Sequence, residues 1–430
     1  MFAYHVQART MKKSAIRALN TFLILLFVVV TAQVRAEGEK PEILMPRARI
    51  QAQELGVIVN DEDPLSVRIA EYYRQARGIP EQNLIHVRIP TGRKQIGDRE
   101  FASIQARIAA QTPDHVQAYA LTWVEPYRVK CMSITTAIAY GGFDEKWCSE
   151  RGSKCTPTAR GEYYNSPSLL PWQHLGIRPT LSIAALSFDD ARALIDRGVA
   201  SDGTWPSGTA YLLDTSDKAR TIRAAFFPRI REVFGNHLRI ESLQQDHLYD
   251  RDDVLFYFTG QKRVKGLDTL GFVPGAIADH LTSGAGQLTA GWQMSALRWL
   301  EAGATGSFGA VKEPCNYIGK FPNPGILMAY YLQGATLLEA YWKSVAMPGE
   351  GIFIGEPLAA PFSGYRLHAA GDHWQLQTRQ LASGRYRLLT APSRVGPFRA
   401  EDFILQVRPG EQHFRLPRLD RAVYRLQPQD

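Results

Sequence analysis

The sequence predicts an α/β protein: a mainly parallel sheet with helices on both faces, followed by a small antiparallel β module. Two observations predict the parallel sheet. Short apolar runs alternate along the chain with segments of helical periodicity, and these runs are apolar throughout, as expected of strands buried on both faces. A third observation predicts the β module, because from residue 365 onward apolar and polar residues alternate in short segments separated by turns.

The first repeating unit begins with a buried strand at 55–60. Asp63 is typical of a helix N-cap and Pro64 of the first helical position, while Gly78 predicts the end of that helix. The pattern continues with a strand, a helix and a strand at 84–89, 101–110 and 117–123. Strands alternating with helices in this way favour parallel pairing.

The alternation breaks near residue 125 and resumes near residue 205. Because residues 125–180 are rich in Gly, Ser, Pro, Tyr and Cys, and only 134–139 looks helical there, we interpret the stretch as an insertion. Beyond it, further strands and helices are expected at 209–213, 254–259, 297–302, 303–309, 327–332 and 337–345. The predicted domains are a signal peptide at 1–36, an α/β domain at 37–364 with its insertion at about 125–205, and a β module at 365–430.

Residues 1–36 have the features of a secretory signal peptide. Three basic residues precede nine consecutive apolar residues at 22–30, too few for a mature membrane-spanning helix. Val34-Arg35-Ala36 then offers a cleavage site. Cleavage after Ala36 predicts an exported protein without a transmembrane segment, in the periplasm, at the cell surface or outside the cell.

The charge excludes a nucleic-acid partner. The 430 residues carry 50 basic and 42 acidic groups, a net charge of +8, but five of the basic residues and none of the acidic ones lie in 1–36. The remainder has 45 basic and 42 acidic groups, which leaves no electropositive surface for nucleic acid. No metal or cofactor motif is present, so neither is expected. The partners that fit an exported chain are another exported or cell-surface protein, or a polysaccharide.

Four cysteines predict two structural disulfides. An even number of cysteines in an exported protein indicates a disulfide framework, and the spacing lacks the paired Cys-x-x-Cys knuckles of a zinc site. Three pairings are possible, and the sequence leaves the choice open. The cysteines are Cys131, Cys148, Cys155 and Cys315.

Polar residues at the ends of the predicted strands are candidates for a binding crevice, because ligands of open α/β sheets bind at the carboxyl ends of the strands. The acidic members could hold a cation or a cationic group of a substrate. A purely structural role, such as capping a helix, is the alternative for each. The candidates are Asp61, Glu125, Asp214, Gln261 and Glu313.

A second set of residues suggests hydrolase chemistry. Asp279, His280 and Ser283 are the residue types of a catalytic triad. However, an adjacent Asp and His need not orient each other, and no Gly-x-Ser-x-Gly elbow is present. Cys315 could serve as a nucleophile only if its thiol stays free of a disulfide.

Six segments together carry a resemblance that spans 55–362. They are 59–66, 127–135, 278–283, 303–307, 313–315 and 339–344. In these segments the chain resembles an uncharacterised family of exported bacterial proteins, found in genomes that carry exosortase, the proposed PEP-CTERM sorting transpeptidase. The resemblance implies a Gram-negative cell with an exosortase system, and it implies no reaction.

The distal half has a second, weaker resemblance. Strand 256–260 ends in Gly260, segment 278–283 follows, and Gly303-Ala304 and 355–358 come later. This order is similar to that of caspase-like peptidases of the gingipain type, in which one strand ends in Gly-His and the next in the catalytic Cys. The resemblance implies a caspase-like or flavodoxin-like fold. Here Gln261 stands in the histidine position and the cysteine position has no cysteine, so both catalytic groups are missing.

The leading hypothesis is therefore an exported protein linked to exosortase systems, in which a diverged peptidase-like scaffold acts as a binding protein. One alternative is a peptidase-like or amidase-like hydrolase that uses the crevice residues or a free Cys315. The other alternative is a structural surface protein that is attached through its β module.

Overall fold

The structure is a computed structural model that describes residues 40–151, 154–408 and 410–429. The predicted signal peptide lies outside the described residues. Contacts divide the described chain into two units. The α/β unit comprises residues 47–365 and 378–381, and the β unit comprises the residues up to 46, 366–377 and those from 382 onward. In the described portion, no helix has both the length and the apolar character needed to cross a membrane.

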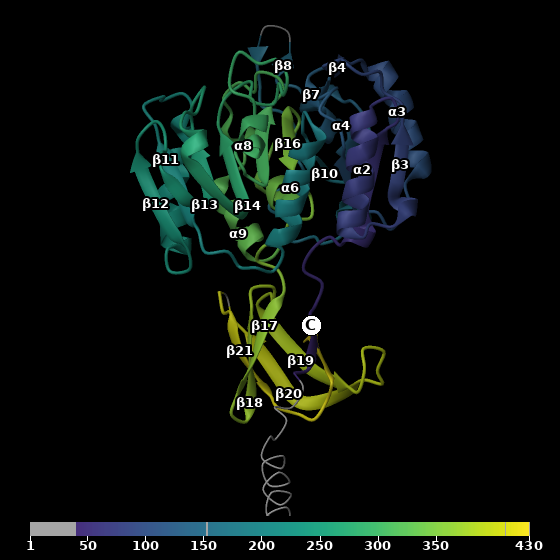
Figure 1. Cartoon of the computed structure of the whole chain (residues 1–430), viewed down its shortest axis with the longest axis vertical. Coiled ribbons are helices and arrows are strands. Elements are labelled where there is room, and N and C mark those ends of the chain that lie inside the picture. Colours follow the sequence, from purple (N-terminus) through teal and green to yellow (C-terminus); the bar gives the residue numbers. More distant parts are fainter. Residues whose placement is uncertain (1–39, 152–153, 409, 430) are drawn as a thin grey trace, which may run out of the picture. The chain divides into compact units, whose positions relative to one another are not determined.

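A ten-stranded sheet forms the centre of the α/β unit (Figure 1). The pair β15–β16 is antiparallel, and the other neighbouring strands of this sheet pair in parallel. The prediction of a mainly parallel sheet is therefore confirmed. In spatial order the strands are β12 (Arg239–Gln244), β11 (Thr209–Asp214), β13 (Arg251–Thr259), β14 (Leu270–His280), β15 (Gly306–Ala310), β16 (Gly351–Gly355), β10 (Thr180–Ser182), β5 (Ala118–Leu121), β2 (Leu55–Asn60) and β3 (Leu84–Val87).

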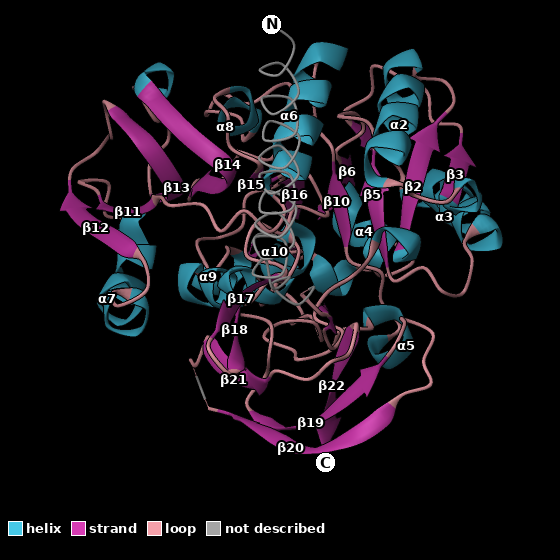
Figure 2. Ribbon diagram, turned by 60° about the horizontal axis from the view of Figure 1, so that its bottom comes forward, coloured by secondary structure: helices cyan, strands magenta, loops and turns pink. Residues whose placement is uncertain are grey.

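Helices cover both sides of this sheet, as predicted. Figure 2 shows α2, α6 and α8 on one side and α7, α9 and α10 on the other. The helix α3 packs against β3, and α4 packs against β10 and β16. Their bounds are α2 (Pro64–Arg77), α3 (Asp98–Gln111), α4 (Ile134–Ala139), α6 (Phe188–Ser201), α7 (Phe227–Phe234), α8 (Leu297–Glu301), α9 (Pro324–Leu332) and α10 (Leu337–Ser344).

The helix α2 shows how local sequence sets these elements. Asp63 is its N-cap, and the Asp63 carboxylate accepts a hydrogen bond of 2.9 Å from the Leu65 N–H. Pro64 occupies the first turn, where its missing N–H costs nothing. Gly78 ends the helix with φ of 63°, a left-handed conformation that favours glycine. Each of these three predictions is confirmed.

The predicted insertion is shorter than expected, because the stretch 125–205 contains two elements of the main fold, β10 and α6. Strand β10 has only three residues, too few to show a periodic pattern. Helix α6 contains Gly198, a poor helix former. A Cβ atom at Gly198 would lie only 2.6 Å from Glu356 Cγ, so close packing requires the glycine that weakens the helical signal.

The remaining part of this stretch is held by two disulfides. Cys131 pairs with Cys148 and Cys155 with Cys315, with Cα–Cα distances of 5.7 and 5.6 Å. The disulfide framework is thus confirmed, and its pairing is now defined. The short elements found here and just before it are β4 (Gln95–Ile96), β6 (Arg128–Val129), β7 (Met132–Ser133), β8 (Glu150–Arg151), β9 (Lys154–Cys155) and α5 (Pro171–Leu175).

The β unit contains two small sheets. One has the order β1 (Glu42–Leu44), β22 (Val423–Gln429), β19 (Gly384–Ala391) and β20 (Arg399–Val407), and the other β17 (Tyr365–Ala370), β18 (His373–Thr378) and β21 (His413–Pro417). The antiparallel pairings β19–β20, β19–β22 and β18–β21 match the alternating pattern. Strand β1 pairs in parallel with β22, so residues 42–44 belong to this unit and not to the α/β domain, where the sequence placed them.

A buried carboxylate joins α2, α6 and the end of β16. Glu356 is fully buried, and its Oε1 accepts hydrogen bonds from the Tyr73 hydroxyl at 2.6 Å and from Arg77 Nε at 3.0 Å. Arg77 also forms ion pairs with the Glu356 carboxylate and with Asp202. The neighbouring negative charges raise the pKa of Arg77 despite its burial, so the guanidinium stays charged.

We expect Glu356→Gln to lower the free energy of unfolding by about 3 kcal/mol or more, because removing one partner leaves the Arg77 charge buried with less compensation. Chemical denaturation followed by circular dichroism measures this change. The matched control is Glu71→Gln, which removes an exposed partner of Arg74 on the same helix and should change stability by less than about 1 kcal/mol. Equal effects of the two substitutions would contradict a central role for Glu356.

Candidate functional site

Three neighbouring strands bring most of the predicted site residues together. Strands β11, β13 and β14 are adjacent and parallel, and Thr259 at the end of β13 lies beside His280 at the end of β14. Asp214 ends β11 and Gln261 follows β13. The order predicted from the caspase-like resemblance is present: two parallel strands, then α8, the Gly303 turn and β15.

Asp279 lies inside the protein and cannot meet a ligand. Its carboxylate Oδ1 is 2.5 Å from Arg223 NH1, and both side chains are almost fully buried. Arg223 also donates a hydrogen bond of 2.9 Å to the Thr259 carbonyl. Burial raises the pKa of Asp279, and the charge of Arg223 opposes that shift. The pair joins the 3-10 helix Thr221–Phe226 to β13 and β14.

His280 is buried as well, and both of its ring nitrogens are engaged. Nδ1 accepts a hydrogen bond of 2.9 Å from the Trp299 indole N–H, and Nε2 donates one of 3.2 Å to the Met294 carbonyl. Burial lowers the pKa of His280 to about 3. The imidazole is therefore neutral, with its proton on Nε2, and has no free lone pair with which to act as a base.

Ser283 lies in a turn that a glutamine holds in place. Gln293 Oε1 accepts hydrogen bonds from the Thr282 hydroxyl at 2.8 Å and the Gly284 N–H at 2.6 Å, while Gln293 Nε2 donates to Ser283 Oγ at 3.1 Å. Arg220 Nε adds a hydrogen bond of 2.9 Å to Thr282. Ser283 thus contacts an amide donor, whereas a serine nucleophile needs a base at that distance.

Gln261 and Asp214 also take part in local hydrogen bonds. The Asp214 carboxylate accepts a hydrogen bond of 2.8 Å from the Thr221 hydroxyl. Hydrogen bonds from the Ser216 backbone, the Ser216 hydroxyl and the Gln261 side chain lower the pKa of Asp246, so this carboxylate is ionised beside Gln261. These hydrogen bonds position the loops that follow β11 and β13.

Of the three other crevice candidates, Asp61 lies far from β13 along the sheet. Asp61 follows β2, six strand spacings from β13 or about 29 Å, and pairs with His86 Nδ1 at 2.7 Å. Glu125 accepts a hydrogen bond from the Thr289 hydroxyl. Glu313 is exposed and accepts one of 3.0 Å from the Cys315 N–H. Asp61 therefore lies away from the ends of β13 and β14, whereas Glu125 contacts the loop that follows β14. A shared binding role for the five candidates stays a prediction.

Cys315 is paired with Cys155, and the structure contains no free cysteine. The alternative of a free Cys315 thiol is therefore wrong for this structure, because a disulfide sulfur has no thiolate to offer. In the described residues, no group of three His, Cys, Asp or Glu side chains converges as a metal site would require.

An exposed tryptophan near the strand ends was not expected from the sequence. Trp292 is 62% exposed, and Lys262 Nζ lies 3.8 Å above the centre of its ring. Arg263 donates a hydrogen bond of 2.7 Å to the Trp292 carbonyl. Cation–π contact and this hydrogen bond hold the 281–295 loop against the segment after β13.

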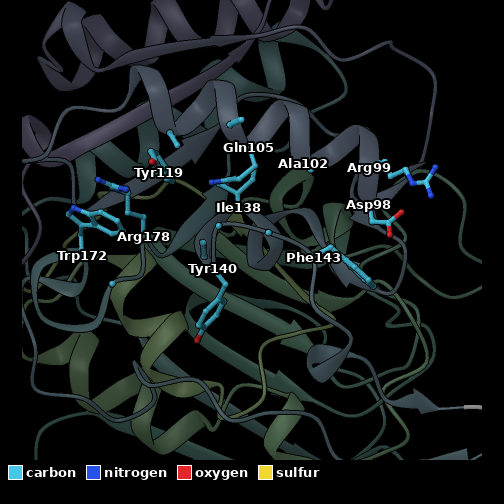
Figure 3. A pocket seen from close by; sticks show the side chains of 16 residues that line it. Asp98, Arg99, Ala102, Gln105, Tyr119, Ile138, Tyr140, Phe143, Trp172 and Arg178 are labelled. Atoms are coloured by element: carbon cyan, nitrogen blue, oxygen red, sulfur yellow. The ribbon is translucent and has the colours of Figure 1, made fainter.

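A groove of about 840 Å³ lies along α3, away from β13 and β14. On α3 its wall includes three exposed small residues, Ala102, Ala106 and Ala109, beside the polar Asp98, Arg99 and Gln105. The rest of its lining comes from Tyr119 of β5, from the end of α4 and the turn after it, and from α5 and the segment that follows. Figure 3 shows Trp172 and Arg178 together at one end, Phe143 and Asp98 toward the other, and Gln105 between them.

The Trp172 end of the groove holds a buried cation. The Arg178 guanidinium stacks 3.4 Å from the centre of the Trp172 ring, and its Nε donates a hydrogen bond of 2.9 Å to the Val116 carbonyl. Arg178 is only 9% exposed, and burial lowers its pKa. Among the described residues it forms no ion pair with a carboxylate. A flat, rigid aromatic–cation surface therefore ends the groove.

Sequence reasoning missed the groove, because its lining comes from four segments that only the fold brings together. The alanines of α3 carried a usable signal, since they lie on one helical face that would otherwise be polar. Trp172 and Arg178 carried none, because isolated aromatic and basic residues in an irregular stretch have no pattern. Gln293 was missed for the same reason.

Comparisons with known proteins gave few matches. No model of a protein family matches the chain, and no curated protein matches it. Among solved structures, one described as "Structure of Protease" aligns over 89% of this chain and 92% of its own, with 9% identity and a TM-score of 0.41. The complex of Porphyromonas gingivalis RgpB pro- and mature domains aligns over 88% of this chain and 100% of its own, with 11% identity and a TM-score of 0.36. These TM-scores are too low to support an argument about this chain.

We expect the buried His280 to make stability depend on pH. Because the folded protein lowers the pKa of His280 from 6.5 to about 3, the unfolded chain binds the proton more readily between these values, and stability falls as the pH falls. The loss from pH 6.5 to about pH 4 should be about 3 kcal/mol. In the His280→Gln variant the free energy of unfolding, measured by denaturation, should fall by about 3 kcal/mol less over this pH range, because all other titrating groups are shared. Identical slopes for the two proteins would contradict this role of His280.

Proposed function

We propose that the protein is an exported, non-catalytic binding protein that holds a polysaccharide chain in the groove along α3. One observation carries the proposal: the groove of about 840 Å³ has a smooth wall and an aromatic–cation end, and lies away from the strand ends where a peptidase-like scaffold would act. Its volume is in the range of known ligand sites, about 300–1,000 Å³.

The side chains at the strand ends support a role without catalysis. Ser283 contacts Gln293, His280 is neutral with both nitrogens engaged, and Asp279 is buried against Arg223. Hydrolysis by a serine or a thiol needs a nucleophile, a base within hydrogen-bond reach and a group that orients the base. Asp279, His280 and Ser283 do not form such a set, because Ser283 has no base at hydrogen-bond distance and His280 has no free nitrogen. The hydrolase alternative thus has no supporting geometry.

The form of the groove favours a sugar chain over an extended peptide. An extended peptide that binds by strand addition needs a free sheet edge, and this groove is walled mainly by a helix and by turns. Ala102, Ala106 and Ala109 give a shallow surface. The rings of Trp172 and Phe143 offer apolar faces for C–H groups, and Gln105 and Asp98 offer polar atoms for hydroxyls.

The proposed location is the periplasm or the outer surface of a Gram-negative cell. The signal-like pattern of 1–36 supports export, as do the two disulfides, because such bonds persist in oxidising compartments. The resemblance of 59–66 and the other segments to exosortase-associated proteins supports a role in surface or exopolysaccharide biology.

We expect the purified mature protein to release no product from peptide or amide substrates. Fluorogenic peptidase and amidase assays over a broad substrate panel measure this. Any trace of activity should be the same in Ser283→Ala, because Ser283 has no base beside it. Activity that copurifies with the protein and disappears in Ser283→Ala would contradict the non-catalytic role.

We expect the protein to bind exopolysaccharide isolated from the bacterium that makes this protein. The Ala106→Trp substitution should weaken that binding about tenfold or more, because the indole fills the groove. Cosedimentation or isothermal titration calorimetry measures the affinity. The matched control is Ala110→Trp, an exposed position on the same helix that does not line the groove.

Two results of this experiment would contradict the proposal. Equal binding by Ala106→Trp and Ala110→Trp would place the polysaccharide elsewhere. No binding to the polysaccharide, together with Ala106-dependent binding to a purified exported protein of the same cell, would assign the groove to a protein partner.

A further inference from the structure

A second cavity lies at the other end of the strands that carry Asp214 and Gln261. It has a volume of about 540 Å³ and is lined by Thr209, Arg239 and Asp253, at or near the starts of β11, β12 and β13. Because these three strands are parallel, the cavity is at their amino ends, opposite the carboxyl ends described above. Buried Leu332 and Phe362 provide apolar lining.

An arginine that forms no ion pair with a carboxylate of the described residues faces this cavity. Arg379 lines it and lies over two aromatic rings, 5.7 Å from the centre of Trp205 and 5.2 Å from that of Phe362. Its Nε is buried and has no hydrogen-bond partner within the described chain. Burial lowers the pKa of Arg379, with no acidic group opposing that shift. A partly buried guanidinium whose Nε lacks a hydrogen-bond partner is stabilised when an anion binds within its reach.

The other charged groups around the cavity leave it electropositive. Asp253 is the one acidic residue in the lining, and it accepts hydrogen bonds from Thr209 at 2.6 Å and Tyr211 at 2.7 Å. Arg239 NH1 lies 3.4 Å from the same carboxylate and balances its charge. No carboxylate of the lining is therefore left to balance the charge of Arg379. The exposed His237 adds a further ring nitrogen at the rim of the cavity.

The backbone beside Arg379 is strained, which is a second and independent observation. Trp205 has φ of +53°, a conformation that bulky residues rarely adopt. Two hydrogen bonds hold it there: its backbone N–H to the Pro361 carbonyl at 3.0 Å, and its indole N–H to the Ser363 carbonyl at 2.8 Å. Strain of this kind is found where a side chain must be held for a ligand.

We propose that this cavity is an oxyanion-binding site, in which the guanidinium of Arg379 holds a carboxylate or phosphate group against the face formed with Trp205. The planar guanidinium matches the two oxygens of such a group with parallel N–H donors. The apolar lining of Leu332 and Phe362 suits the body that carries the anion. The proposal is independent of the groove along α3, which shares no lining residue with this cavity.

The test titrates the full mature protein with sodium phosphate and, separately, with sodium glucuronate at constant ionic strength, by isothermal titration calorimetry. We expect saturable binding of at least one anion, and the stronger of the two identifies phosphate or sugar carboxylate as the source of the group. Arg379→Met should weaken binding about tenfold to a hundredfold. The control Arg192→Met removes an exposed arginine of α6 and should leave binding unchanged.

Arg379→Lys separates a binding defect from a folding defect. This variant keeps the charge and loses the planar donors, so it should fold, as circular dichroism would show, and bind more weakly than the unmodified protein. No saturable binding of either anion, or the same affinity in Arg379→Met or Arg379→Lys as in Arg192→Met, would overturn the proposal.

Discussion

The buried carboxylate of Glu356 is the contact on which the α/β unit depends. It follows β16, the strand that joins the five strands from β12 to β15 with the four strands from β10 to β3. By binding Tyr73 and Arg77 of α2 and packing on Gly198 of α6, it ties the two groups of strands to the helices of one face. A buried charge is tolerated only when it is paired and hydrogen-bonded, so the surrounding residues have little freedom to change.

The same rule explains why the strand ends hold polar residues without carrying chemistry. Asp279 and His280 are of the right type for catalysis, but each is buried and has a partner inside the fold: Arg223 for the carboxylate, Trp299 and Met294 for the imidazole. A catalytic group must reach its substrate and change its protonation state. Buried and paired inside the fold, Asp279 and His280 do neither, which makes these residues part of the core.

The sequence predicts the fold better than it predicts the site, and the reason is physical. The limits of α2 follow from Asp63, Pro64 and Gly78, which act within a few residues. By contrast, β10 and α6 depend on contacts with distant strands, and Gly198 even weakens the local signal. The site residues were selected by their chemical type, yet their roles depend on burial and on partners such as Arg223 and Gln293. These partners lie close in space to the site residues, but no sequence motif identifies them.

The groove along α3 and the cavity that Arg379 faces share a feature that no single segment shows. In each, an arginine lies over a tryptophan ring and forms no ion pair with a carboxylate of the described residues: Arg178 on Trp172, and Arg379 on Trp205. Arg379 belongs to the short segment 378–381, which packs with the α/β unit although the residues on either side of it belong to the β unit. An aromatic ring holds a guanidinium in position without neutralising it. The positive charge therefore remains available to a ligand. This distinguishes both arginines from Arg77 and Arg223, whose charges are paired with the buried carboxylates of Glu356 and Asp279.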